Sequence, residues 1–415
     1  MMKKNITLII LMILVSGFFF TGCSNEDKSD DIKVNSELKP ISSDLPLSVR
    51  IAQSFVRRHP GNVTYDEYMT KKKWNYEQGV MLESMRKMYQ HTGDEQYYNF
   101  VKGNLEYYIE ADGSIKTYPY EAFNLDKIKP GGALLFVYEK EKDVKLKKAA
   151  DTLMKQLANQ PRTESGGYWH KKRYPYQMWL DGLFMAQPFK AEYCSMFGIN
   201  EKFDDILFQF THIYEKTVDK NSGLLYHAWN ENKEQQWADK ETGCSPHFWG
   251  RAIGWYMMAI VDVLDYVPED HPEREKLYEI LGNVSEAISG VRDPESKLWF
   301  QVLDLPEREG NYLEASCAAM FTYALAKGAN EGYIDKKFTQ IAKESYEAIM
   351  KHHVEIDENG YIDLLNTCSA AGLGGDPYRD GSFEYYISEP TRKNDFKGYG
   401  PFLYSAIELE KAGVL

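Results

Sequence analysis

The chain has 415 residues and a formal charge of −13 at pH 7. It contains no long basic run, which argues against nucleic acid or an anionic membrane surface as the main partner. The length exceeds that of a typical single-core domain, but repetitive helical barrels reach it, so one large domain behind a tail is expected. The 30 tyrosines, 20 phenylalanines and 8 tryptophans mainly indicate core packing, and they also suit stacking on sugar rings.

Residues 1–23 have the pattern of a bacterial export signal. Two lysines precede an apolar run from Ile6 to Phe20, and roughly 15 apolar residues are too few to span a bilayer comfortably. Thr21 and Gly22 before Cys23 resemble a lipoprotein processing site, which predicts lipidation of Cys23. The protein would then be exported and held by this lipid to a bacterial membrane, on its periplasmic side or at the cell surface. Because Phe20 replaces the usual aliphatic residue, plain secretory cleavage remains the alternative.

Residues 24–42 are polar, acidic and free of aromatic side chains. This composition predicts a disordered tether, with the folded domain over 43–415. The four cysteines in that domain, Cys194, Cys244, Cys317 and Cys368, lack any C-x-x-C or Cys/His spacing. Neither a disulfide framework nor a metal site is expected, and Cys194 and Cys317 are interpreted as packing residues.

Apolar periodicity predicts helices in chain order along almost the whole domain. They are expected at 45–58, 76–92, 95–110, 131–142, 144–159, 178–196, 201–217, 249–266, 271–290, 313–328, 335–353 and 400–413. Glycines such as Gly93, Gly198 and Gly328 are interpreted as helix stops. Strand-like alternation is limited to short pieces at 298–302 and 361–364.

The helices form pairs with a spacing of roughly 60 residues, and no short solenoid repeat recurs. Six hairpins predict an all-α fold, a closed six-hairpin (α/α)6 barrel. The second helix of each pair is expected to be inner, because the beginnings of these helices are rich in Trp, Tyr, His and Asp. A cup lined by those residues would then form at one end of the barrel.

Asp181 lies in the apolar stretch from Tyr174 to Phe189, where an acid loses much of its water on folding. Such an acid is either held by hydrogen-bond donors or used for chemistry. Asp126 falls at the start of another inner helix, so the two carboxylates could meet across the cup. Two carboxyls in a semi-apolar pocket cannot easily both ionise, which predicts one raised pKa. The alternatives are a buried, hydrogen-bonded Asp181 and an Asp126 that caps its helix.

His170 and His227 each follow a glycine-containing turn and an aromatic residue, which suits loop residues aimed at a pocket, although single histidines are often structural. Arg251, with Trp255 four residues later, is a candidate clamp for a carboxylate, and its alternative is a salt bridge. No phosphate loop, G-x-S-x-G elbow or H-E-x-x-H motif is present, so P-loop, serine-hydrolase and zinc-protease classes have no support.

Several blocks in order resemble the family 105 glycoside hydrolases, the unsaturated rhamnogalacturonyl hydrolases. They run from Trp74 to Pro401 and include WNYEQG, DKIKPG, ESGGYWHKKRYPYQMWLDGLFMAQPF, GLLYHAWNE, WADKETGCSPHFWGRAIGWY, NYLEASCAAMFTYALAKG and SEPTRKNDFKGYGPF. The resemblance implies the same barrel, with Asp181 as the catalytic acid and Asp126 as the second active-site aspartate. It implies that the sugar contacts Tyr76, His170, His227, Trp249, Arg251 and Trp255.

The resemblance also implies a mechanism without metal or cofactor. The substrate would be an oligosaccharide made by a lyase, with a C4=C5 double bond in its terminal uronate. Asp181 would protonate C4, a water would add at C5, and the resulting hemiketal would collapse to release the neighbouring sugar. Pectic rhamnogalacturonan is the expected source. The glycine-rich segment 368–386 is expected to form a rim loop that selects the leaving sugar, which keeps other uronate partners, such as those from ulvan lyases, open.

Two other readings keep the barrel. The aspartates could be the acid and base of an inverting glycosidase acting on saturated sugars. A noncatalytic sugar-capturing lipoprotein would also fit the export signal and the aromatic residues, but it would not need two acids in the cup. No partner beyond the sugar and the lipid anchor is expected, and a monomer is the expected oligomeric state.

Overall fold

The computed structural model describes residues 39–61, 63 and 72–415. The predicted export signal with Cys23, and the tether up to residue 38, lie outside the described residues. The compact unit begins at Lys39, a few residues before the expected position 43. Ile41 is buried there, and its N–H donates to the carbonyl of Asn359 at 2.8 Å. This contact places the last residues of the expected tether in the folded unit.

All twelve predicted helices are present in the described chain, with ends that shift by a few residues. They are α1 (Leu47–Arg58), α2 (Tyr76–Thr92), α3 (Glu95–Tyr108), α4 (Gly131–Glu141), α5 (Val144–Ala158), α6 (Leu180–Phe197), α7 (Phe203–Thr217), α8 (Gly250–Val263), α9 (Arg274–Gly290), α10 (Ala315–Asn330), α11 (Lys337–His352) and α13 (Phe396–Lys411). The short α12 (Phe383–Ser388) was not predicted, nor were the 3₁₀ turns η1 (Tyr120–Ala122), η2 (Leu125–Lys127) and η3 (Asn200–Lys202).

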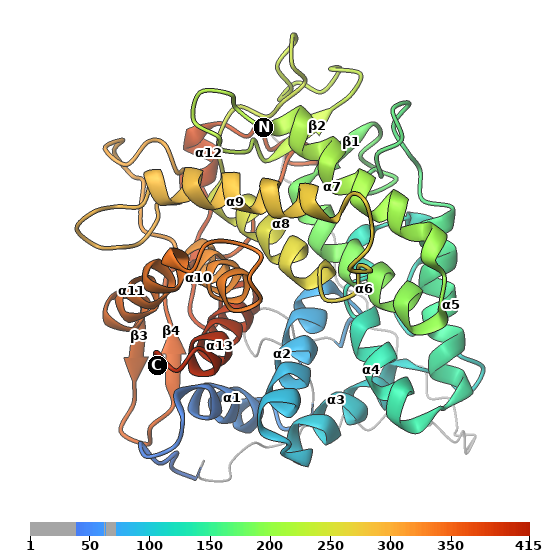
Figure 1. Ribbon diagram of the computed structural model, residues 1–415, viewed down its shortest axis with the longest axis vertical. Coiled ribbons are helices and arrows are strands. Elements are labelled where there is room, and N and C mark those ends of the chain that lie inside the picture. The colour runs from blue at the N-terminus through green and yellow to red at the C-terminus, as the bar shows by residue number, and fades with distance from the viewer. Residues whose placement is uncertain (1–38, 62, 64–71) are drawn as a thin grey trace, which may run out of the picture. The chain divides into compact units, whose positions relative to one another are not determined.

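Six of these helices form a closed inner ring. In order around the ring, α2, α4, α6, α8, α10 and α13 each contact the next, and α13 contacts α2 again. The other long helices lie outside this ring (Figure 1). The fold is therefore the predicted all-α (α/α)6 barrel, and the second helix of each pair is the inner one.

The residue pattern explains which helices are inner. Every residue of α8 is buried, since its sequence is apolar apart from Arg251 and Asp262, whereas α5 buries one stripe and turns its lysines outward. Two glycines let inner helices approach closely. A Cβ at Gly254 would lie 2.7 Å from Met320 on α10, and one at Gly400 would lie 2.3 Å from Val80 on α2.

The helix stops were predicted in part. Gly93 and Gly198 end α2 and α6 in the left-handed conformation, with φ of 71° and 67°. Gly328 does not end a helix but lies within α10 against Ile334. Cys194 and Cys317 are fully buried, which confirms their packing role.

The strands are short and pair two by two. The pairs are β1 (Gln177–Trp179) with β2 (Ala228–Asn230), β3 (Val354–Ile356) with β4 (Ile362–Leu364), and β5 (Thr367–Cys368) with β6 (Thr391–Arg392), all antiparallel. The strand expected at 361–364 is confirmed as β4. The one expected at 298–302 is wrong, because that segment makes only single bridges, from Phe300 to Leu313 and from Val302 to Trp249.

The expected helix 178–196 begins later than predicted. Met178 and Trp179 belong to β1, because their backbone pairs with residues 228 and 229. The helix therefore starts at Leu180, and Asp181 is its second residue and not part of its interior. No helix in the described part of the chain is long and apolar enough to cross a membrane.

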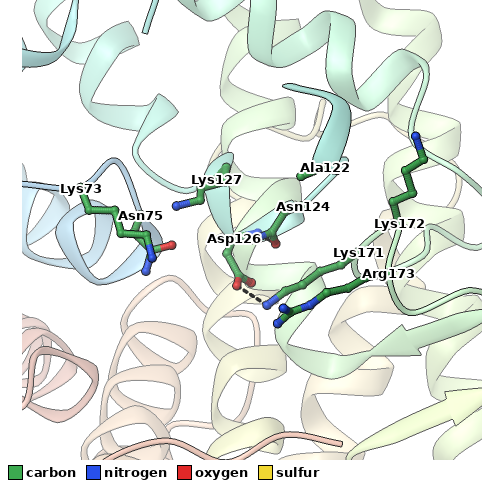
Figure 2. A pocket seen from close by; sticks show the side chains of 9 residues that line it. All are labelled: Lys73, Asn75, Ala122, Asn124, Asp126, Lys127, Lys171, Lys172 and Arg173. Carbon is green, nitrogen blue, oxygen red and sulfur yellow. Dashed lines mark hydrogen bonds and ion pairs between the residues drawn. The ribbon is translucent and has the colours of Figure 1, made fainter. Parts of the chain in front are cut away.

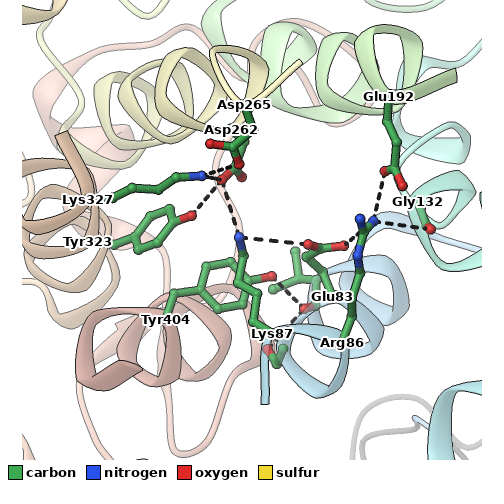
Figure 3. Close-up of polar contacts among 12 residues, drawn as sticks. Glu83, Arg86, Lys87, Gly132, Glu192, Asp262, Asp265, Tyr323, Lys327 and Tyr404 are labelled. Atoms are coloured by element: carbon green, nitrogen blue, oxygen red, sulfur yellow. Dashed lines mark hydrogen bonds and ion pairs between the residues drawn. The ribbon is translucent and has the colours of Figure 1, made fainter. Parts of the chain in front are cut away.

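A network of buried ion pairs links four inner helices inside the ring (Figure 3). At one side of it, the carboxylate of Asp262 on α8 accepts from the hydroxyl of Tyr323 at 2.5 Å and lies 3.1 Å from the ammonium of Lys327, both on α10. Lys87 on α2 approaches the same carboxylate at 3.4 Å. At the other side, Arg86 on α2 binds Glu192 on α6 at 2.8 Å.

Removing one member of this network leaves an opposite charge buried without its partner. We expect Asp262→Ala to lower the free energy of unfolding by about 3 kcal/mol, measured by urea denaturation. Glu347→Ala on the exposed side of α11, where Lys343 is 3.9 Å away, serves as control and should change it by less than about 0.5 kcal/mol. A loss at Asp262 as small as that of the control would contradict a stabilising role for the network.

Candidate active site

The predicted acids lie where inner helices begin. Asp126 is in η2, just before α4, and Asp181 is in the first turn of α6. Glu314 and Asp395 are the N-cap residues of α10 and α13, and Glu77 is in the first turn of α2. Carboxylates are favoured at helix N-termini because the peptide N–H groups there carry partial positive charge. The starts of these helices thus bring several buried acids to one end of the ring.

Extended backbone segments hold these helix starts side by side. The N–H of Leu125 donates to the carbonyl of His170, and the N–H of His170 donates to that of Gln177. The strand β1 then pairs with β2, and the N–H of Leu180 donates to the carbonyl of His227. Four segments that are distant in the sequence therefore run next to one another, which places His170 beside Asp126 and His227 beside Asp181.

Asp126 is buried and has two basic partners. Lys171 Nζ lies 2.5 Å from one carboxylate oxygen, and His170 Nε2 lies 3.3 Å from the other. Burial alone would raise the pKa of Asp126, but the Lys171 ammonium and the His170 contact outweigh it and hold the pKa well below its usual range. Burial lowers the pKa of His170, so the ring is a neutral donor and Lys171 supplies the charge. Asp126 does not cap its helix as the alternative reading had it.

Asp181 has a different partner. Its Oδ2 lies 3.2 Å from Nε2 of His227, and neither atom makes a hydrogen bond to any other described residue. Burial favours the neutral acid here too, but His227 and then His170 outweigh it and hold the pKa of Asp181 below its usual value. The sequence predicted a raised pKa for one of the two aspartates. That expectation is wrong for the free protein, because each carboxylate has a basic partner of its own.

His227 is held from behind by a residue that the sequence analysis missed. The hydroxyl of Tyr386, which lies at the end of the segment 368–386, is 2.8 Å from Nδ1 of His227. Both side chains are fully buried, and the Tyr386 ring stacks on Trp249 with centroids 5.8 Å apart. If the hydroxyl donates to Nδ1, the ring proton lies on Nε2, the nitrogen 3.2 Å from Oδ2 of Asp181. Tyr386 is 159 residues away from His227, so no local signal could reveal the pair.

Gly182 and Trp179 shape the wall next to Asp181. A Cβ at Gly182 would lie 3.1 Å from Nδ1 of His170, a tight contact, so glycine lets the imidazole lie close against the start of α6. The rings of His170 and Trp179 stack with centroids 4.6 Å apart and planes 8° apart. This stack of His170 on Trp179 restrains the orientation of the His170 ring.

The other aromatic residues that were predicted to contact the sugar differ in burial and in their partners. Tyr76 is the half-buried first residue of α2, and burial raises the pKa of its hydroxyl, as do the nearby carboxylates of Glu77 and Asp126. Trp249 is buried, and its indole N–H donates to Gln301 at 3.1 Å. Trp255 is buried against Phe184, with ring centroids 4.6 Å apart, which is a packing position in the core.

The side chain of Arg251 on α8 is buried and bonded to neighbouring residues, so it does not project freely into a cup. Its Nε donates to the hydroxyl of Ser316 at 2.7 Å, and its Nη2 binds the carboxylate of Glu314 at 3.2 Å and the carbonyl of Cys368. Only Nη1 has no hydrogen-bond partner among the described residues. The salt bridge that the sequence analysis named as the alternative is therefore formed, and one nitrogen of the predicted clamp is buried without a hydrogen-bond partner in the described chain.

The rim segment 368–386 packs against the same aromatic wall. Arg379 donates to the hydroxyl of Tyr174 at 2.8 Å, and the N–H of Trp237 donates to the hydroxyl of Tyr378 at 3.0 Å. Tyr174 in turn stacks on Trp179 with centroids 5.1 Å apart. The segment thus connects the aromatic wall to Tyr386 and, through it, to His227.

A basic cavity of about 480 Å³ opens beside Asp126 (Figure 2). It is lined by residues from the segments before α2, α4 and α6: Lys73, Asn75, Ala122, Asn124, Asp126, Lys127, Lys171, Lys172 and Arg173. The ammonium of Lys127 donates to the carbonyl of Trp74 at 2.6 Å. Burial and then the nearby Lys73 charge lower the pKa of Lys127 to about 8.

The structure is a helical barrel whose inner helix starts gather buried acids, histidines and tryptophans, and comparison with known proteins identifies its family. Residues 47–412 match the model of Glycosyl Hydrolase Family 88. A solved family 105 glycoside hydrolase from C. acetobutylicum is 41% identical, with a TM-score of 0.84 over 88% of this chain and 100% of that one.

Two curated relatives are also similar to this chain. Protein Atu3128 of Agrobacterium fabrum is 36% identical over 233 residues, which are 54% of this chain and 97% of its own. The unsaturated rhamnogalacturonyl hydrolase YesR of Bacillus subtilis is 27% identical over 312 residues, 74% of this chain and 83% of its own. The chain therefore belongs to the family 88/105 glycoside hydrolases.

Proposed function

We propose that the protein releases a 4,5-unsaturated uronate from the non-reducing end of oligosaccharides made by a polysaccharide lyase, by adding water across the C4=C5 bond. One observation carries this proposal. Asp181 is a buried carboxylate whose Oδ2 lies 3.2 Å from the His227 imidazole and has no hydrogen-bond partner in the described chain, and Tyr386 holds that imidazole in place. Such an arrangement can deliver a proton to a substrate atom and then accept one from water.

The charge of the substrate explains how Asp181 becomes an acid. In the free site the pKa of Asp181 is lowered, so the carboxyl is ionised near neutral pH. A uronate brings its own carboxylate next to it, and a second negative charge raises the pKa of the first. Asp181 then takes up the proton that it donates. A neutral, saturated sugar would not supply this charge, which favours an unsaturated uronate over the substrate of an inverting glycosidase.

The proposed reaction has three stages, which are proton transfer to C4, addition of water at C5 and release of the neighbouring sugar. Asp181 donates its proton to C4 of the enol ether, and positive charge develops at C5 and the ring oxygen. Water adds at C5 and gives its proton to the same carboxylate. The hemiketal at C5 opens to a ketone, the former ring oxygen becomes a hydroxyl on C1, and C1 collapses to an aldehyde as the neighbouring sugar leaves with its own oxygen. No nucleophile at C1 is needed.

The surrounding residues have supporting roles. Asp126 stays ionised beside Lys171 and His170, and it would bind sugar hydroxyls or orient the water. The free Nη1 of Arg251 would bind the uronate carboxylate, and Tyr76 and Trp249 would contact the ring. Pectic rhamnogalacturonan is the proposed source, because the Bacillus subtilis relative is named for that substrate and the sequence blocks resemble that family.

Asp181→Asn tests the acid role. The amide cannot donate a proton in this way, so kcat should fall by about 10³-fold on an unsaturated disaccharide, followed by the loss of absorbance at about 235 nm that marks the double bond. Asp270→Asn, at an exposed position, is the matched control and should keep wild-type activity. Full activity in Asp181→Asn would overturn the assignment, and unchanged absorbance with the wild-type protein would overturn the hydration reaction itself.

Tyr386→Phe tests the positioning of His227. Loss of the hydroxyl leaves Nδ1 of a buried imidazole without its partner, which costs about 1 to 3 kcal/mol. We expect kcat on the same disaccharide to fall about tenfold with little change in KM, because the ring would no longer be fixed against Asp181. The exposed Tyr107 provides the control, Tyr107→Phe. An unchanged kcat, or an equal loss in the control, would argue against a positioning role.

A further inference from the structure

The basic cavity beside Asp126 has more cationic side chains than acidic ones to pair with them. Five cations line it, Lys73, Lys127, Lys171, Lys172 and Arg173, and Asp126 is the only acid among its lining residues. This contrasts with the whole chain, whose formal charge is −13. Side chains of like charge together create a positive potential, which favours the binding of an anion among them.

The partners of these cations show which of them remain available. Lys171 is paired with Asp126, and Lys127 is bonded to the carbonyl of Trp74. Within the described chain, Lys73, Lys172 and Arg173 have no carboxylate partner. Lys172 and Arg173 instead lie over aromatic rings, of Phe123 at 5.4 Å and Tyr174 at 4.8 Å.

The network inside the ring is a useful contrast. There, Arg86 pairs with Glu192, and Lys327 pairs with Asp262 and Asp265. Those buried cations stabilise the fold through acids of the protein itself. In the basic cavity, Lys73, Lys172 and Arg173 are exposed and have no such acid in the described chain, so they are not part of a buried network of this kind.

Arg173 is the side chain best placed to bind an anion. In Figure 2 its guanidinium lies beside the Lys171 ammonium and faces the cavity, whereas the Lys172 side chain extends away from Asp126. A guanidinium binds a carboxylate or a sulfate through two parallel N–H donors. Packing against Tyr174 limits the number of rotamers that Arg173 loses on binding.

The cavity does not include the reacting groups. Asp181, His227 and Trp249 are absent from its lining residues, whereas Asp126 is one of them. A uronate that reacts at Asp181 therefore does not need this cavity for its own ring. The space lies to the Asp126 side, where the remainder of an oligosaccharide can extend.

We infer that the basic cavity is a binding site for a second acidic group, a carboxylate or a sulfate ester, carried by the part of the oligosaccharide beyond the reacting uronate. This inference rests on the proposed function. It predicts that the enzyme prefers substrates with more than one anionic group. Because the site is open to solvent, salt should weaken this preference.

Three substrates test the inference, each ending in the same unsaturated uronate. One has a neutral leaving sugar, one has a sulfate ester on that sugar, and one is a tetrasaccharide with a second uronate. We expect kcat/KM to be about fivefold higher for at least one of the two anionic substrates at low salt, and the difference to shrink at high salt. The substrate that shows it identifies the acidic group. Equal kcat/KM for all three would overturn the inference.

Variants locate the effect in the cavity. Arg173→Gln should lower the ratio of kcat/KM between the preferred anionic substrate and the neutral one to near unity, and Arg173→Lys should keep part of it because the charge remains without the fork. Lys336→Gln, on the exposed surface before α11, removes one positive charge elsewhere and should leave the ratio unchanged. An equal change in Arg173→Gln and Lys336→Gln would assign the preference to overall charge and contradict the cavity.

The experiment separates this inference from the proposed function. If the wild-type protein removes the double bond of none of the three substrates, the hydration reaction is wrong. If it removes the double bond of all three without a salt-sensitive preference, the reaction stands and only the anion site is wrong.

Discussion

The active site depends on which basic partner stabilises the negative charge of each buried carboxylate. Ionised acids lose their hydration when six inner helices close into a ring, and each therefore needs a basic partner or hydrogen-bond donors at short distance. Asp126 has Lys171 and His170, Asp181 has His227, and Glu314 has Arg251. These separate pairs, and not a shared proton between two aspartates, set the charge of the free site.

This pairing gives the two aspartates different chemistry although both begin inner helices. Lys171 and His170 hold the pKa of Asp126 well below its usual range, so that carboxylate stays ionised when a sugar binds. The basic side chains that act on Asp181 are the imidazoles of His227 and His170, and its protonation can respond to the carboxylate of an incoming uronate. The carboxylate of the bound uronate thus raises the pKa of Asp181 and favours its protonated form. The preference for a uronate and the proton transfer therefore have the same cause.

The fold could be predicted from the sequence because it follows from local periodicity. Apolar residues at helical spacing fixed the twelve long helices, and aromatic and ionisable residues at alternate helix starts identified the inner ring. The start of α6 could not be predicted in this way. The pairing of β1 with β2 delays the start of the helix to Leu180, and it joins residues about 50 positions apart. That pairing also moves Asp181 into the first turn.

The partners within the site were harder to predict for the same reason. Arg251 was interpreted as a clamp, but its Glu314 partner is 63 residues away, and Tyr386 is 159 residues from His227. Lys171 was the one partner with a local signal, since it follows His170 directly. Contacts across a closed ring depend on the register of its helices, which composition and spacing do not determine.

The fate of the double bond tests the central claim most directly. The wild-type enzyme is incubated with an unsaturated disaccharide in D₂O, and the released uronate is examined by NMR and mass spectrometry. The account predicts one deuterium at C4 and a ketone at C5, formed at the same rate as the leaving sugar. A product that keeps its C4=C5 bond, with water added at C1, would contradict the account.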